Sequence, residues 1–142
     1  MQMSTKTLSA TRNCLMFSYK AVLPEEAWQY EDWSILEMVN LTSDIYTLYS
    51  VYEANDLAYK DTKALVLMFR PRVDADPVVC AFEVAKDKRM CHYGENIVKD
   101  ILEAFPGVKF VYHSGNVKID NLFSLFVPED RLIDSKTSSP AL

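Results

Sequence analysis

The residues of this chain best suited to chemistry lie close together between positions 89 and 94. Arg89, Cys91, His92 and Gly94 stand in the run Asp-Lys-Arg-Met-Cys-His-Tyr-Gly-Glu-Asn, just before a segment with helical periodicity. Three kinds of chemistry fit these residue types: a metal site, a thiol nucleophile and a phosphate-binding turn. The alternative is a tight turn between a strand and a helix, with solvated charges beside it.

The metal and thiol interpretations need partners that the sequence places poorly. Adjacent residues such as Cys91 and His92 rarely ligate one tetrahedral zinc together, and the other histidine, His113, lies about twenty residues further on. Cys91 with His113 as its base stays open, because such partners meet in space and not in sequence. A semi-buried thiol without a catalytic role is the favoured interpretation of Cys91.

A phosphate-binding turn has the stronger physical basis. A glycine between a strand and a helix leaves the first N–H groups of the helix free, and the helix dipole favours an anion there. Arg89, together with Lys86 and Lys88, adds positive charge at the same point. On spacing alone, a turn that binds nothing is slightly favoured, because a single glycine is a weak signal.

The elements that must position these residues follow from hydrophobic patterning. Dense Val, Leu and Phe predict strands, and apolar side chains at helical spacing, ended by Pro or Gly, predict helices. The second half of the chain predicts, in order, strands at 64–69 and 77–84, a helix at 95–105, a strand at 108–113 and a helix at 116–126. This order predicts an α/β or α+β sandwich, a sheet with helices packed on its faces.

The first half of the chain is less regular. Residues 13–22 predict a strand, and Pro24 followed by two glutamates is a helix-start signal. A short amphipathic helix is predicted from Asp32, where Ile35, Leu36 and Val39 share one face. The β-branched and aromatic residues of 44–53 favour a strand, although their tyrosines also recur every third residue.

Length and composition limit the classes of protein. A chain of 142 residues fits one domain, here predicted as a flexible N-terminus over 1–12, a domain over 13–134 and a disordered tail over 135–142. The net charge of −5 disfavours a nucleic-acid partner. Three widely spaced cysteines favour a reducing compartment, and no apolar run reaches the roughly 18 residues of a membrane span. We therefore expect a cytoplasmic protein, or a virion-associated one if it is encoded by a phage.

The run from Val84 to Leu102 resembles the signature of the GNAT superfamily of acyl-CoA N-acyltransferases. In that signature a central strand is followed by Arg/Gln-x-x-Gly-x-Gly/Ala and an amphipathic helix. Arg89 falls on the Arg/Gln position and Gly94 on the last Gly/Ala. His92 replaces the middle glycine, which in the family lets the backbone approach the cofactor pyrophosphate.

A second segment, residues 111–126, is similar to the family's fifth strand and following helix. Asn116 matches its asparagine, which in many members helps to hold the cofactor arm, while Ile119 and Leu122 fall on an alanine and a phenylalanine. Phe123 falls on the tyrosine whose hydroxyl protonates the leaving thiolate. Phenylalanine cannot donate a proton, so the usual general acid is absent at this position.

The resemblance implies a fold and an activity. The fold is a mixed central sheet with helices on both faces and a shortened C-terminal element. The activity is direct transfer of an acyl group from acetyl-CoA or another acyl-CoA to a small-molecule or protein amine. Glu83 is the expected base, and Tyr112 or His113 replaces the missing acid. The expected cofactor-binding positions are Val84, Arg89, His92, Gly94, Glu95, Asn116 and Phe123.

Two other functions stay open. The histidine at a glycine position, Phe123 and the short C-terminus are also typical of a GNAT-shaped protein that no longer catalyses and acts as a binding or structural module. The third function is an inhibitor that binds a host protein through exposed aromatic residues, for which the candidates are Tyr46, Tyr49, Tyr52 and Tyr59. An exposed sheet edge at the short C-terminus would be completed by a partner chain, in a homodimer or with a host protein.

Overall fold

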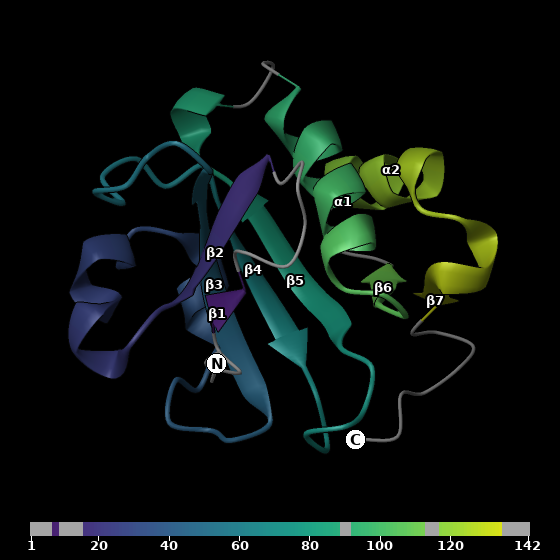
Figure 1. Cartoon of the computed structure of the whole chain (residues 1–142), viewed down its shortest axis with the longest axis horizontal. Coiled ribbons are helices and arrows are strands. Elements are labelled where there is room, and N and C mark those ends of the chain that lie inside the picture. The colour runs from purple at the N-terminus through teal and green to yellow at the C-terminus, as the bar shows by residue number, and fades with distance from the viewer. Residues whose placement is uncertain (1–6, 9–15, 89–91, 113–116, 135–142) are drawn as a thin grey trace.

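The computed structural model of the chain has one central sheet with helical segments on each of its faces (Figure 1). It describes residues 7–8, 16–88, 92–112 and 117–134. Seven strands follow one another across the sheet in chain order: β1 (Thr7–Leu8), β2 (Phe17–Ala21), β3 (Tyr46–Glu53), β4 (Ala64–Phe69), β5 (Val78–Val84), β6 (Lys109–Tyr112) and β7 (Leu132–Asp134).

The sheet is mixed, as the sequence predicts. Strands β1 to β5 pair antiparallel with their neighbours, whereas β5–β6 and β6–β7 are parallel pairs. The change of direction follows from the connections, because a helix joins β5 to β6 and another precedes β7. Strand β7 confirms that the residues after the last α-helix are enough for one further strand.

Two α-helices and four 3₁₀ segments make up the helical part of the described chain. They are η1 (Pro24–Tyr30), η2 (Ser34–Met38), η3 (Lys86–Lys88), α1 (Tyr93–Ala104), α2 (Val117–Phe126) and η4 (Glu129–Arg131). The sequence predicts helices at the positions of η1 and η2, but both are 3₁₀ helices. Their turns are closed by bonds three residues apart, such as Glu26 N–H to Leu23 O and Leu36 N–H to Trp33 O.

Helices α1 and α2 cover one face of the sheet, and they lie together on one side of the molecule in Figure 1. Their apolar stripes pack on alternate residues of β2 to β6. Ile97, Val98 and Ile101 of α1 and Phe123 of α2 are at most 1% exposed. Gly107, at φ +83°, turns the chain from α1 into β6, in the left-handed region that glycine favours.

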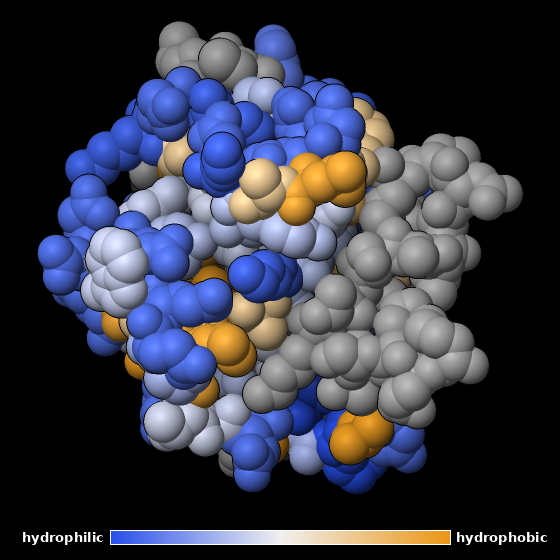
Figure 2. Space-filling model, turned by 60° about the vertical axis from the view of Figure 1, so that its left-hand side comes forward, coloured by the Kyte–Doolittle hydropathy of each residue, from blue (hydrophilic) through white to orange (hydrophobic). Residues whose placement is uncertain are grey.

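Segments η1 and η2 cover the opposite face with a smaller cluster. Tyr30 of η1 and Ile35 of η2 pack there on Leu48, Leu65 and Leu67 of the central strands. Strand β4 is therefore buried along its whole length, because both of its faces are covered. Figure 2 shows this side of the molecule as mostly hydrophilic, with the hydrophobic residues in small separate patches.

A β-bulge at Cys80 changes the pattern of β5. Leu67 pairs with Ala81, but the next residue, Met68, pairs with Val79, so Cys80 is the extra residue. Val79 and Phe82 consequently face the same side of the sheet, under the α-helices. Burial raises the pKa of the Cys80 thiol to about 11, which makes it a poor nucleophile at neutral pH.

The N-terminal end of the chain contributes a short strand to the sheet. Thr7 and Leu8, within the N-terminal segment expected to be flexible, form β1 and pair with Lys20 and Tyr19 of β2. The rest of residues 1–12 and the tail over 135–142 lie outside the described residues.

The four tyrosines do not form one exposed aromatic surface. Tyr49 and Tyr52 are 5% and 4% exposed, and the alternation of β3 places them on opposite faces of the sheet. Tyr59 packs its ring on Tyr52, with ring centroids 5.1 Å apart. The surface proposed for an inhibitor is therefore wrong in this form.

Candidate functional site

The turn predicted to bind phosphate lies between the end of β5 and the start of α1. Segment η3 follows β5 directly, and α1 begins at Tyr93. His92 is the N-cap of α1, with a left-handed backbone (φ 62°, ψ 14°) and an imidazole that is 82% exposed. This is a conformation that glycine adopts at less cost than histidine.

Gly94 has a packing role in this structure. A Cβ added to it would lie 3.2 Å from a Leu122 methyl group of α2 and 3.6 Å from a Val84 methyl group of β5. The glycine therefore lets the first turn of α1 approach α2 and the sheet closely. Val84 itself is 8% exposed and belongs to the core.

Glu95, in the first turn of α1, is paired with a lysine and lies near a histidine. Its carboxylate lies 2.8 Å from Lys99 Nζ and 3.7 Å from His92 Nδ1. The bond from Lys99 is the main reason that the pKa of Glu95 is lowered, and the nearby His92 contributes less. A carboxylate in the first turn also interacts favourably with the helix dipole.

The lysines of the turn differ in their surroundings. Lys86 is exposed, whereas Lys88 Nζ lies 3.5 Å from Asp61 and 3.4 Å from Asp87. Asp61 also accepts a bond of 2.5 Å from Lys63, whose ammonium group lies 5.3 Å from the centre of the Tyr93 ring. The bond from Lys63 is the largest cause of the lowered pKa of Asp61, and Asp61 in turn raises the pKa of Lys88.

An open groove of about 780 Å³ runs beside the start of α1. Two of the polar residues that line it are hydrogen-bonded to each other: Tyr93 Oη donates to the Glu53 carboxylate, at the end of β3, over 2.7 Å. This bond raises the pKa of Tyr93, because Glu53 stabilises the neutral phenol. Lys88 also lines the groove, but two aspartates already pair with it, so the described lining is not strongly basic.

Glu83, the expected base, lies on the other face of the sheet, next to η2. Its carboxylate accepts bonds from the backbone N–H groups of Ile35 at 2.8 Å and Ser34 at 3.4 Å. It therefore caps the N-terminus of η2, where two N–H groups need an acceptor. The structure does not bring Glu83 together with the groove, which lies on the α1 side of the sheet.

Phe123 is buried where β5 and β6 separate. Its ring is 1% exposed and packs on Phe82 of β5 and Phe110 of β6, at centroid distances of 5.9 and 5.0 Å. The ladder between these parallel strands comprises Val78 with Lys109 and Val79 with Phe110, although β5 continues for five more residues. Phe123 thus covers the point at which the two strands diverge.

Several candidate residues fall outside what the structure describes. Arg89, Cys91, His113 and Asn116 are among them, and for Tyr112 the structure gives the backbone, at the end of β6, but not the side chain. Within the described residues no group of three or more His, Cys, Asp and Glu side chains is placed to hold a metal ion.

No motif or spacing in the sequence singles out the polar cluster around Lys63. Lys63 is 6% exposed, at the start of a wholly apolar strand, and that position is the one feature that could have drawn attention to it. Its side-chain partners are Asp61, two residues earlier, and the ring of Tyr93 in α1, and the contact with Tyr93 depends on the fold.

Comparison with protein-family models and with curated proteins finds no match to this chain. Among the helices of the described residues, none is both long and apolar enough to cross a membrane.

Proposed function

We propose that this chain is an N-acyltransferase that uses acyl-CoA, with acetyl-CoA as the simplest donor, and transfers the acyl group to an amine. The observation that carries the proposal is the divergence of the parallel strands β5 and β6 after Val79 and Phe110. Helix α1 begins beside the end of β5, at the turn whose sequence resembles the pyrophosphate loop of the GNAT superfamily. An extended arm can lie along a diverging strand, and an anion can lie at the helix N-terminus.

Such a cofactor would use residues from both sides of this gap. The end of β5 would hold the pantetheine arm through its backbone, and Arg89, Lys86 and the first N–H groups of α1 would hold the pyrophosphate. When bound, the cofactor supplies a thioester, and its thiolate is a stable enough leaving group that a dedicated acid is not essential. Glu83 would take the amine proton through a water molecule from an acceptor that enters on the η2 side of β5, opposite the groove, because its carboxylate accepts the N–H of Ile35 there.

Calorimetric titration with acetyl-CoA tests the binding part of the proposal. We expect a dissociation constant on the order of micromolar, lost or weakened about a hundredfold in Arg89→Glu because a reversed charge repels the pyrophosphate. Lys60→Glu makes the same charge change at an exposed loop position and should bind normally. Absence of binding at millimolar acetyl-CoA would exclude the acyltransferase.

Release of free thiol over a panel of primary amines tests the catalytic part. Glu83→Gln should lower turnover by about two orders of magnitude or more without changing acetyl-CoA affinity, as expected for loss of a general base. Glu129→Gln, at an exposed position in η4, is the matched control. Binding of acetyl-CoA with no thiol release for any amine would instead identify a binding module of the same shape.

A further inference from the structure

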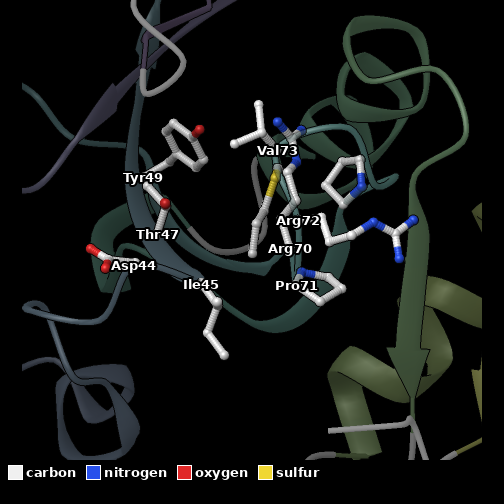
Figure 3. A pocket seen from close by; sticks show the side chains of 10 residues that line it. Asp44, Ile45, Thr47, Tyr49, Arg70, Pro71, Arg72 and Val73 are labelled. Atoms are coloured by element: carbon white, nitrogen blue, oxygen red, sulfur yellow. The ribbon is translucent and has the colours of Figure 1, made fainter.

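A second hollow lies at the other end of the sheet, where β3 begins and β4 ends (Figure 3). It has a volume of about 240 Å³ and is partly enclosed. Tyr49 and Met68, which belong to the core under α1, form its floor. Ile45 and Val73 flank it and are 40% and 81% exposed, so apolar side chains lead from solvent to the floor.

The walls of this pocket are fixed by bonds outside it. The backbone N–H of Arg70 donates to Ile45 O at 2.7 Å, which ties the end of β4 to the segment before β3. At the far end of the β4–β5 loop, the N–H of Lys109 donates to Pro77 O at 3.1 Å. The Asp76 carboxyl group also packs on Gly107, within 2.7 Å of where a Cβ would stand. The pocket is therefore formed without a ligand, which lowers the entropic cost of binding.

Arg70 is the charged group best placed to act in the pocket. Its side chain is half-buried, and no carboxylate of the described residues lies within ion-pair distance of its guanidinium group. Burial raises the pKa of Tyr49, and the positive charge of Arg70 opposes this rise in part, which shows that the two side chains lie close enough to interact. A half-buried cation beside an apolar floor favours an anionic partner.

The other charged residues of the lining are less suited to this role. Arg72 is 73% exposed, and its Nε lies 3.1 Å from the Asp74 carboxylate. Asp44 is exposed and lies on the opposite side of the view from the two arginines in Figure 3. The lining thus presents one guanidinium group without a described carboxylate partner.

We propose that this pocket binds a small monocarboxylate with an apolar body, with its carboxylate on Arg70 and its apolar part on Tyr49 and Met68. The planar guanidinium fork matches a carboxylate with two parallel hydrogen bonds. On β3, Thr47 of the pocket and Glu53 of the groove are six residues apart, which is about 20 Å at the rise of a strand. This site is therefore separate from the proposed acyl-transfer site and does not depend on it.

Three probes of equal chain length test the proposal: sodium hexanoate, 1-hexanol and hexylammonium chloride. Titrations followed by amide chemical shifts in NMR should show saturable changes around Tyr49, Met68 and Arg70 with hexanoate. Hexanol should bind about tenfold or more weakly, because a charge-assisted bond to Arg70 is lost, and hexylammonium should not bind there. Equal affinity for hexanoate and hexanol would overturn the proposal, as would the absence of saturable changes with hexanoate.

Matched variants locate the charge that matters. Arg70→Met should weaken hexanoate binding by about tenfold or more and leave hexanol binding unchanged, whereas Arg72→Met should change neither. Val73→Glu places a competing carboxylate at an exposed position of the mouth, where it should abolish hexanoate binding without disturbing the fold. If Arg72→Met weakens hexanoate as much as Arg70→Met, or if Val73→Glu binds normally, the assignment to Arg70 is wrong. Acetyl-CoA binding by Arg70→Met should equal that of the unmodified chain.

Discussion

The two faces of the sheet are closed in different ways. Among the described residues, nineteen buried side chains form one apolar cluster under α1 and α2, whereas the cluster under η1 and η2 contains six. The smaller cluster is supplemented by directional bonds: Tyr30 Oη lies 3.0 Å from Tyr52 Oη and 3.1 Å from Thr62 Oγ1, and Glu83 caps η2. Burial of apolar area dominates stability, whereas one hydrogen bond contributes about 1 kcal/mol net.

The contrast between the two faces indicates where substitutions can be made without unfolding the protein. The α-helical face supplies most of the apolar burial, so substitutions there should be costly. The opposite face depends on a few polar contacts between short 3₁₀ segments and strands, and it carries the expected base, Glu83. We therefore infer that stability is concentrated on the first face and that the second face tolerates adjustment.

The largest effect is expected at Phe123, between β5 and β6. Phe123→Ala should lower the free energy of unfolding by about 3–5 kcal/mol, because it removes a buried ring and leaves a cavity. Leu125→Ala, on the exposed side of the same helix, should change it by about 0.5 kcal/mol or less. Urea denaturation measures both values. Similar losses for the two variants would show that burial does not determine stability on this face.

A smaller loss of stability is expected when Asp100, a buried carboxylate on the face under α1 and α2, is removed. Asp100 of α1 is 3% exposed and accepts bonds from Tyr19 Oη at 2.7 Å and from the Met16 N–H at 3.3 Å. Asp100→Ala should cost about 2–3 kcal/mol, because buried donors lose a charged acceptor. A double-mutant cycle with Tyr19→Phe should give a coupling energy of about 1.5 kcal/mol. A coupling near zero would show that the bond contributes nothing beyond packing.

The sequence predicts the elements better than it predicts their geometry. The strand at 64–69 and the helices over 95–105 and 116–126 are confirmed to within two residues, because each buries a long apolar stripe with a clear period. Segments η1 and η2 are short and half-exposed, so periodicity cannot separate α-helix from 3₁₀ helix there. The bulge at Cys80 cannot be predicted, because the residues of β5 favour a strand whether or not one of them is unpaired.

The candidate site is less predictable for a physical reason. A motif states which residues follow one another, but not which way a side chain turns. Gly94 packs on Leu122, Phe123 fills the core, and Glu83 caps η2, and each of these roles depends on residues far away in sequence. Lys63 and Arg70 are also hard to predict from the sequence, because some of the residues around them are distant in sequence and are brought near by the fold.

On the face under η1 and η2, a smaller loss is expected when a hydroxyl group is removed. Tyr30→Phe deletes the hydroxyl group that forms hydrogen bonds with Tyr52 Oη and Thr62 Oγ1. It should lower the free energy of unfolding by about 1–2 kcal/mol. Tyr46→Phe removes a hydroxyl for which the described residues provide no hydrogen bond, and it should be nearly neutral. A loss above about 3 kcal/mol for Tyr30→Phe, comparable with that for Phe123→Ala, would contradict the proposed contrast between the faces.

The smallest effect is a dependence of stability on alkaline pH. Burial is the largest cause that raises the pKa of Tyr30 to about 12 from an ordinary value of 10.0. The folded state therefore holds its proton more tightly than the unfolded chain, so this contribution is complete below pH 10 and is lost as the pH rises toward 12. By pH 10.5 the loss should be about 1 kcal/mol or less.

The control is Tyr30→Phe, whose stability should fall less over the same pH range. Some dependence on pH should remain in this variant, because burial also raises the pKa of Tyr49. Urea denaturation between pH 8 and pH 10.5, with phenolate absorbance recorded in parallel, measures both proteins; equal slopes would show that Tyr30 is not protected from titration by the fold.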